Sequence, residues 1–203
     1  MGDPRAQLDR LMATLAKGPV PVRYRDAITG EWKDGQFSRG HLAMLTRLLA
    51  YQPQAASLLP LQFAEANQGR VDSLMALSEM VTRDISDQIM HGMQLSVMCA
   101  EDAPRLKARP EDYELVLGDA IISVSLNQCS VWPKGPVSPG FHEPLATDIP
   151  TLLLSGEYDP VTPPRYGEEV LKSLGKARHL VGKGQGHILL SRGCTPRLVG
   201  QFV

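Results

Sequence analysis

The stretch that decides the fold runs from residue 151 to residue 187 and reads TLLLSGEYDPVTPPRYGEEVLKSLGKARHLVGKGQGH. Residues 151–155 form a short apolar run, which is typical of a strand buried on both faces of a parallel sheet. Helical spacing of apolar residues predicts a helix from about Pro164 to Gly175, and residues 177–181 predict a second strand. Strand, helix and strand in this order form a βαβ unit, so we expect parallel strands and an α/β fold.

Two chemically important residues follow these strands at their carboxyl ends, where functional groups of open α/β sheets gather. Asp159 comes just after the first strand, and His187 comes just after the second. Neighbouring parallel strands lie about 4.8 Å apart, so the two turns can bring a carboxylate to an imidazole. Such a carboxylate holds the Nδ1–H tautomer of the histidine and leaves Nε2 to accept a proton. We therefore predict that Asp159 and His187 form an acid–base pair, with side chains about 2.6–3.2 Å apart.

The rest of the chain predicts a mostly helical cap and a connection to the βαβ unit. Residues 1–93 form the expected cap, and residues 94–203 form the C-terminal part of the core, including a linking helix. Asp3 is the expected N-cap of a first helix that Gly18 ends, and Ser38 is the expected N-cap of a later one.

Smaller elements are predicted from shorter patterns. Residues 20–37 form a hairpin, because apolar and polar residues alternate on either side of a turn at residues 26–30. Residues 94–99 resemble a short strand, and residues 110–125 have the spacing of one continuous helix. The five prolines of residues 132–150 predict a stiff, ordered loop.

Composition excludes several classes of protein. The 203 residues include 21 Lys and Arg against 22 Asp and Glu, and this balance argues against a nucleic-acid partner, which would need a clustered cationic face. No apolar run approaches the roughly 18–20 residues of a membrane span, and the first ten residues contain no signal-peptide segment. The histidines and cysteines lack the spacing of a metal site, so we expect no metal. We also expect no cofactor and, from the lack of an apolar span, no membrane partner.

Residues 149–164 (IPTLLLSGEYDPVTPP) and 182–187 (GKGQGH) resemble the C-terminal end of an α/β-hydrolase, which carries the acid and the histidine of the catalytic triad in this order. The chain is similar in particular to the proline-iminopeptidase and tripeptidyl-aminopeptidase (TAP-like) branch of secreted bacterial serine peptidases. That likeness rests on VMCAED at 97–102, CSVWP at 129–133 and RGC at 192–194, while the hairpin resembles part of the branch's cap.

The resemblance implies roles for individual residues. It makes Asp159 and His187 the triad acid and base, and Glu101 the candidate carboxylate that binds the free α-ammonium group of a substrate. It implies a disulfide between Cys99 and Cys129, with Cys194 as the remaining thiol, whose partner would be a cysteine beyond Val203 in the full protein. It also favours a secreted or periplasmic location, and a peptide or small ester as substrate.

The chain departs from the family because it contains no G-x-S-x-G sequence for the nucleophilic serine and no HGG-type segment for the oxyanion donors. The nearest string surrounds Ser138 in the proline-rich loop and lacks the first glycine, so we reject it. We expect the C-terminal half of a serine exopeptidase that needs its N-terminal half as partner, and we expect the isolated chain to be marginally stable and inactive. Two alternatives remain: an esterase or lipase of the same fold, or a non-catalytic cap-and-base module.

Overall fold

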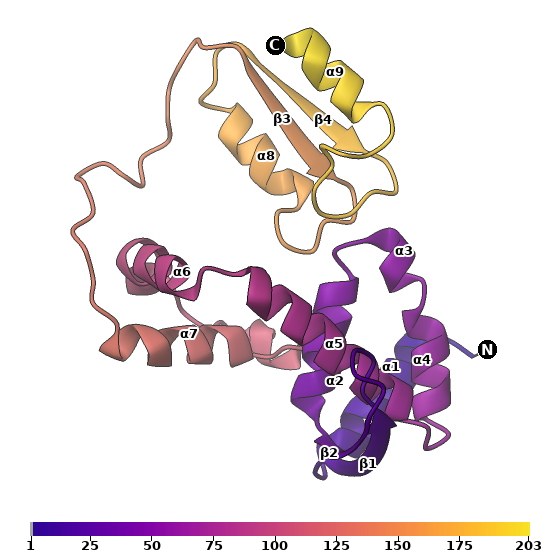
Figure 1. Cartoon of the computed structure of the whole chain (residues 1–203). Coiled ribbons are helices and arrows are strands. Elements are labelled where there is room, and N and C mark those ends of the chain that lie inside the picture. The colour runs from indigo at the N-terminus through magenta and orange to yellow at the C-terminus, as the bar shows by residue number, and fades with distance from the viewer. Residues whose placement is uncertain (1) are drawn as a thin grey trace. The chain divides into compact units, whose positions relative to one another are not determined.

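The computed structural model describes residues 2–203 and divides into two compact units (Figure 1). The first unit extends through Leu45 and continues from Pro60 to Phe141, and the second comprises Thr46–Leu59 and His142–Val203. The predicted division between residues 93 and 94 therefore does not coincide with the boundaries of the units. Within residues 94–141, Cys99 is joined to Cys129 by a disulfide and packs with Ala103 and Trp132, and this segment belongs to the first unit.

The helices and strands follow in this order: α1 (Pro4–Leu15), β1 (Val20–Arg25), β2 (Trp32–Phe37), α2 (Arg39–Leu49), α3 (Pro53–Ala56), α4 (Leu59–Ala66), α5 (Asp72–Gln88), α6 (His91–Val97), the π-helical turn η1 (Met98–Asp102), the 3₁₀ turns η2 (Ala103–Arg105) and η3 (Pro110–Glu114), α7 (Ala120–Val131), β3 (Thr151–Gly156), α8 (Pro164–Leu171), β4 (Ala177–Gly182) and α9 (Thr195–Phe202).

The N-terminal elements form as their sequence predicts. The side chain of Asp3 accepts a hydrogen bond from the backbone N–H of Arg5 at 3.0 Å, and Pro4 occupies the first position of α1. Strands β1 and β2 pair in antiparallel register from Val20 opposite Phe37 to the closing pair at the turn. The predicted first helix and the predicted hairpin are both confirmed.

The hairpin is fastened at its turn by Asp26, whose side chain is only 3% exposed. Its Oδ1 accepts hydrogen bonds from the backbone N–H groups of Ile28 and Thr29, at 2.9 and 3.0 Å. Its Oδ2 accepts from Lys33 and, at 3.3 Å, from Arg83 of α5. The bond from Lys33, followed by those from the turn backbone, holds the pKa of Asp26 well below its ordinary value. This charged group ties α5 to the hairpin, over a core in which Phe37, Leu42, Leu45 and Leu74 are fully buried.

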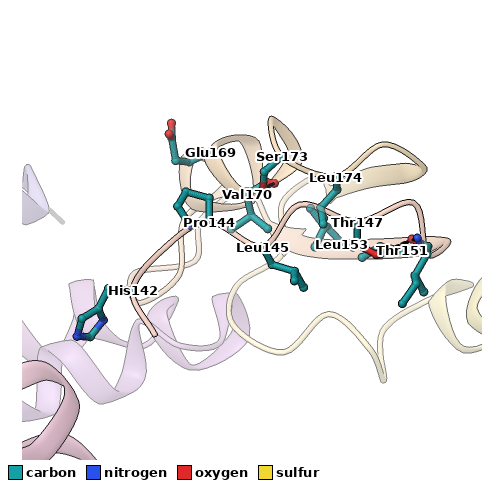
Figure 2. A pocket seen from close by; sticks show the side chains of 11 residues that line it. His142, Pro144, Leu145, Thr147, Thr151, Leu153, Glu169, Val170, Ser173 and Leu174 are labelled. Carbon is teal, nitrogen blue, oxygen red and sulfur yellow. Dashed lines mark hydrogen bonds between the residues drawn. The ribbon is translucent and has the colours of Figure 1, made fainter. Parts of the chain in front are cut away.

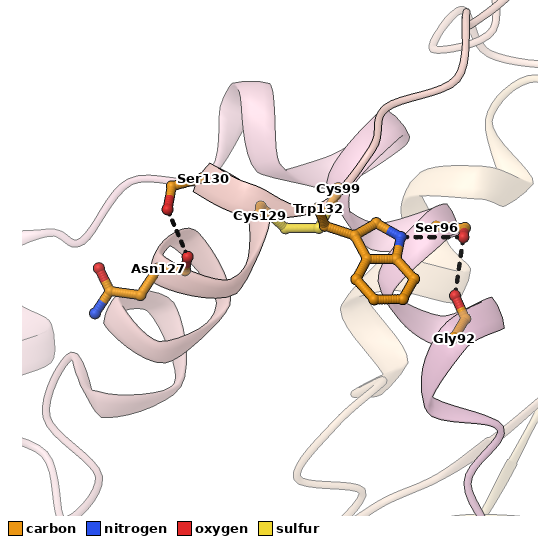
Figure 3. Close-up of a disulfide and its surroundings, with 7 residues drawn as sticks. All are labelled: Gly92, Ser96, Cys99, Asn127, Cys129, Ser130 and Trp132. Carbon is orange, nitrogen blue, oxygen red and sulfur yellow. Dashed lines mark hydrogen bonds between the residues drawn. A yellow bond between two sulfur atoms is a disulfide. The ribbon is translucent and has the colours of Figure 1, made fainter.

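The predicted strand at residues 94–99 is wrong, because this segment is helical (Figure 3). Leu95, Met98 and Cys99 stand at helical spacing and pack together with Cys129 and Trp132. A short apolar run has no decisive periodicity of its own, and here burial against α7 selects the helix. The structure pairs Cys99 with Cys129, as the resemblance implied, with their Cα atoms 5.1 Å apart.

The continuous helix predicted over residues 110–125 is also wrong. A 3₁₀ turn covers Pro110–Glu114, and the α-helix α7 starts only at Ala120 and continues to Val131. Between them Gly118 adopts a φ of 57°, in the left-handed region that ends helices. The apolar residues that suggest one helix therefore belong partly to the 3₁₀ turn and partly to α7.

The second unit contains the predicted βαβ arrangement. Strands β3 and β4 pair in parallel from Thr151 opposite Ala177 to Gly156 opposite Gly182, and α8 connects them. Figure 1 shows α8 packed along one face of this two-stranded sheet. In the loop before β3, Thr147 forms an isolated parallel β-bridge with Leu174. The βαβ prediction is confirmed, and both strands end at the same edge of the sheet.

Candidate active site

The turns after β3 and β4 are joined directly at the carboxyl edge of the sheet. The backbone N–H of Glu157 donates to the carbonyl oxygen of Gly182 at 3.0 Å, and that of Tyr158 donates to Gln185 at 2.8 Å. This approach needs a glycine at position 156, where a Cβ would lie 1.9 Å from the carbonyl oxygen of Gly186. The parallel register and this close packing bring the two turns together.

Asp159 and His187 meet between these turns. Nδ1 of His187 lies 2.9 Å from Oδ2 of Asp159, inside the predicted range. The Asp159 side chain is 4% exposed, and that of His187 is 26% exposed. The distance predicted from the sequence is confirmed, and the pair combines a buried carboxylate with an imidazole that solvent can reach.

The carboxylate of Asp159 is held by the residues that follow it. Its Oδ1 accepts hydrogen bonds from the N–H groups of Val161 and Thr162, at 2.8 and 2.9 Å, and its Oδ2 accepts from the Thr162 hydroxyl at 2.9 Å. Burial alone would raise the pKa of Asp159, but the bonds from Thr162, His187 and Val161 together lower it to about 2. Asp159 is therefore ionised at neutral pH.

This geometry determines what the pair can do chemically. Because an ionised carboxylate only accepts hydrogen bonds, the proton on the shared bond belongs to Nδ1 of His187. Nε2 is then the basic nitrogen, and the negative charge of Asp159 stabilises the imidazolium that forms when Nε2 takes a proton. The arrangement is that of an oriented general base.

Glu157, for which the sequence predicts no catalytic role, connects the same two turns. Its Oε2 accepts a hydrogen bond from the N–H of Gly184 at 2.8 Å, and its Oε1 lies 3.5 Å from Nζ of Lys183. The bond from Gly184 is the main reason why the pKa of Glu157 is lowered. The side chain thus supports the loop that carries His187.

Sequence reasoning missed three residues of the site. Thr162 holds Asp159, and part of this turn carries a signal, because an aspartate side chain commonly accepts a hydrogen bond from the backbone two residues later, as Asp159 does from Val161. Tyr51 and Gln52 contact the backbone of His187 from a distant part of the chain. No local pattern marks that contact.

The other predicted site residues, Glu101, Cys99 and Cys129, lie in the first unit. Glu101 is half-buried in the η1 turn, two residues after the disulfide-bonded Cys99. Beside the disulfide, Nε1 of Trp132 donates a hydrogen bond to Oγ of Ser96 at 3.2 Å (Figure 3). The role predicted for Glu101 stays a prediction. Cys194 is exposed and has no disulfide partner in the described part of the chain.

A pocket of about 440 Å³ lies in the second unit between the proline-rich loop, β3 and α8 (Figure 2). Leu145, Leu153, Val170 and Leu174 make its walls largely apolar. Its strand residues come from the first half of β3, whereas the acid–base pair lies beyond the other end of the strand. Because ligands of open α/β sheets bind beyond the carboxyl ends of the strands, we do not assign the active site to this pocket.

Residues 2–203 contain no group of three or more histidine, cysteine, aspartate or glutamate side chains placed to hold a metal ion. In the same part of the chain, none of the helices combines the length and the apolar character needed to cross a bilayer.

Comparison with known proteins places this geometry in context. Residues 114–203 match the model of the family described as TAP-like protein, a family of α/β-hydrolases. The chain is also 26% identical over 198 residues to the serine protease Hip1 of Mycobacterium bovis and to that of Mycobacterium tuberculosis. The similarity covers 87% of this chain and 34% of the relatives, so the chain spans about a third of their length. The matched family segment includes Asp159, His187 and Cys129.

Proposed function

Residues 114–203 are those of a TAP-like α/β-hydrolase, and from this we propose that the chain is the C-terminal portion of a serine exopeptidase. In this proposal Asp159 and His187 are two members of a catalytic triad, and the enzyme releases N-terminal residues or short peptides by acyl transfer. The single observation that carries the proposal is the 2.9 Å bond between a buried, ionised Asp159 and the partly exposed His187.

The proposed chemistry follows from the roles that the geometry allows. Nε2 of His187 takes the hydroxyl proton of a serine while the serine oxygen attacks the scissile carbonyl carbon. His187 then gives that proton to the leaving amine as the peptide C–N bond breaks, and an acyl-enzyme remains. A water molecule repeats the sequence, and the serine is restored. Asp159 keeps its charge throughout and stabilises the imidazolium.

We propose that the serine comes from outside the 203 residues, because no G-x-S-x-G sequence occurs among them. The similarity covers only 34% of the relatives' length, which leaves room for such a segment in a longer protein. The same observation supports a second candidate function, in which the chain acts as a non-catalytic cap-and-base module that docks onto the missing half.

A fluorophosphonate probe, which reacts covalently with activated serines, tests the proposal. We expect it to label the complete gene product, with its upstream sequence, and to leave the isolated 203-residue chain unlabelled. His187→Gln in the complete product should abolish labelling. Labelling of the isolated chain would contradict the external serine, and a complete product without a G-x-S-x-G serine would favour the non-catalytic module.

A further inference from the structure

The backbone of His187 is held by a dipeptide from a distant part of the chain. Its N–H donates to the carbonyl oxygen of Tyr51 at 2.7 Å, and its own carbonyl oxygen accepts a hydrogen bond from Nε2 of Gln52 at 3.2 Å. Tyr51 and Gln52 belong to the segment Thr46–Leu59, which lies in the same compact unit as the acid–base pair. Both polar groups of the histidine backbone are therefore fixed by two adjacent residues.

Gln52 is itself held at its other end. Its Oε1 accepts a hydrogen bond from the guanidinium group of Arg192, whose backbone N–H donates to the carbonyl oxygen of Leu189 at 2.9 Å. The amide side chain of Gln52 thus links His187 to Arg192, five residues later in the sequence. Because oxygen and nitrogen of the amide each have a partner, the side chain has one preferred orientation.

Tyr51 also contacts the imidazole ring of His187. The two ring centroids lie 5.1 Å apart at an interplanar angle of 75°, an edge-to-face contact. Arg47 covers the tyrosine ring at 5.8 Å and donates to its hydroxyl at 3.5 Å. The tyrosine ring therefore limits the rotation of the imidazole about its side-chain bonds.

The residues on either side of His187 adapt to this contact. A Cβ at Gly186 would lie 2.3 Å from the carbonyl oxygen of Tyr51, so only glycine allows the approach. Ile188 has a φ of 63°, a left-handed conformation that is strained for a β-branched residue. Such strain persists only where the surroundings hold it, and here the hydrogen bonds of Tyr51 and Gln52 hold the adjacent residue.

We propose that Gln52 and Tyr51 are positioning residues for His187, a role that rests on the proposed function of His187 as general base. The bond to Asp159 fixes one nitrogen of the imidazole but leaves the ring free to pivot about that bond. The backbone bonds fix the Cα, and the Tyr51 ring restricts the pivot, so Nε2 keeps one direction toward the serine. Small displacements of a general base are costly, because proton transfer requires hydrogen-bond distance at the reacting atom.

The first test is an NMR measurement of the imidazole of His187 in the full 203-residue chain. The wild-type chain should show a downfield, slowly exchanging Nδ1–H proton that disappears in His187→Gln and in Asp159→Asn. In Gln52→Ala we expect that resonance to broaden beyond detection, and the exchange of the His187 backbone amide to accelerate by about fivefold to tenfold. Gln54→Ala, which removes the same side chain at an exposed site two residues away, should change neither signal.

Two further variants separate positioning from a loss of folding. Gln52→Glu keeps an acceptor for Arg192 but removes the donor to His187, and should repeat the effect of Gln52→Ala at unchanged helical content. Tyr51→Phe keeps the ring and should retain the resonance, whereas Tyr51→Leu should lose it. In the complete enzyme, Gln52→Glu should lower kcat by about tenfold to a hundredfold with little change in KM.

The outcomes distinguish this inference from the function on which it rests. Positioning is overturned if Asp159→Asn removes the resonance and the activity while Gln52→Ala and Gln52→Glu leave both unchanged. The acid–base pair itself, and positioning with it, is overturned if the wild-type chain lacks the resonance or if Asp159→Asn retains full activity.

Discussion

Oδ2 of Asp159 and Nδ1 of His187 lie 2.9 Å apart although 28 residues separate them in the sequence. The parallel register makes this possible, since Gly156 and Gly182 end the two strands at the same level and the following turns are hydrogen-bonded to each other. The acid is buried and held by its own turn, whereas the backbone of His187 is held by a residue from a distant part of the sequence. The two members of the pair are thus held by different parts of the chain.

Replacing Asp159 by asparagine in the complete enzyme should remove most of its activity. Asparagine keeps the size of the side chain, but it has no charge to stabilise the imidazolium and can favour the wrong tautomer of His187. A loss of about 10⁴ in kcat is expected from the corresponding change in a related triad. Steady-state kinetics on a free-amine peptide substrate measures it. Glu168→Gln, the same loss of charge on an exposed residue of α8, serves as the control and should leave kcat unchanged.

The stability of the chain should depend on Asp159 in a defined range of acid pH. Its pKa falls from 3.8 to about 2 on folding, so the folded state binds the proton less readily than the unfolded state. The resulting stabilisation, about 2 kcal/mol, is complete above about pH 5 and is lost as the pH falls toward the folded value. Urea denaturation of wild type and Asp159→Asn at pH 7, 4 and 2.5 measures it.

The difference between these two proteins is the informative quantity, because Asp26 also has a lowered pKa and titrates in both. The difference in the free energy of unfolding should shrink as the pH falls from 5 toward 2.5, where Asp159 becomes protonated first in the unfolded state. A difference that stays constant down to pH 2.5 would contradict the lowered pKa of Asp159.

The βαβ unit and the acid–base pair could be predicted because each depends on patterns within a short stretch. The apolar run at 151–155 and the spacing of α8 identify the unit, and the parallel arrangement then places Asp159 beside His187. The disulfide between Cys99 and Cys129 could be predicted from the resemblance to the TAP-like branch, which the family match of residues 114–203 supports.

Other features could not be predicted because they depend on packing between distant segments. The contact of Gln52 with His187 joins residues 135 positions apart, and nothing around Gln52 marks it. Residues 94–99 are helical because Cys99 is buried against α7. The order of apolar residues within this segment does not reveal that contact. The compact units likewise follow the disulfide and the contacts of Thr46–Leu59 rather than the order of the chain.

Removing the disulfide between Cys99 and Cys129 should destabilise the first unit. The bridge closes a loop with a sequence separation of 30 residues, for which chain entropy gives about 3–4 kcal/mol. Cys99→Ser with Cys129→Ser should lower the free energy of unfolding by that amount, as measured by urea denaturation without reductant. Cys194→Ser, which removes the exposed thiol, should have no such effect. Mass spectrometry that finds three free thiols in the unreduced chain would contradict the pairing.

Glu101 offers the sharpest distinction between a peptidase and an esterase. If its carboxylate binds the α-ammonium group of a substrate, Glu101→Gln in the complete enzyme should raise KM strongly for peptides with a free amine. The lost charge-assisted hydrogen bond corresponds to about 1.5–3 kcal/mol, or roughly tenfold to a hundredfold. Substrates with a blocked amine lack the partner charge, so their KM should change little. Steady-state kinetics on a matched pair, one free and one N-acetylated, gives both values.

The neighbouring Asp102 supplies the control for Glu101. Asp102 is exposed in the same η1 turn, and Asp102→Asn removes the same charge one residue away. If Asp102→Asn raises KM for free-amine substrates as much as Glu101→Gln does, the effect comes from the total negative charge of the turn rather than from a specific contact with Glu101. If Glu101→Gln raises KM equally for free and blocked substrates, recognition of the amine at this residue is wrong. An enzyme that hydrolyses simple esters well, with no dependence on a free amine in wild type or variant, would instead be an esterase.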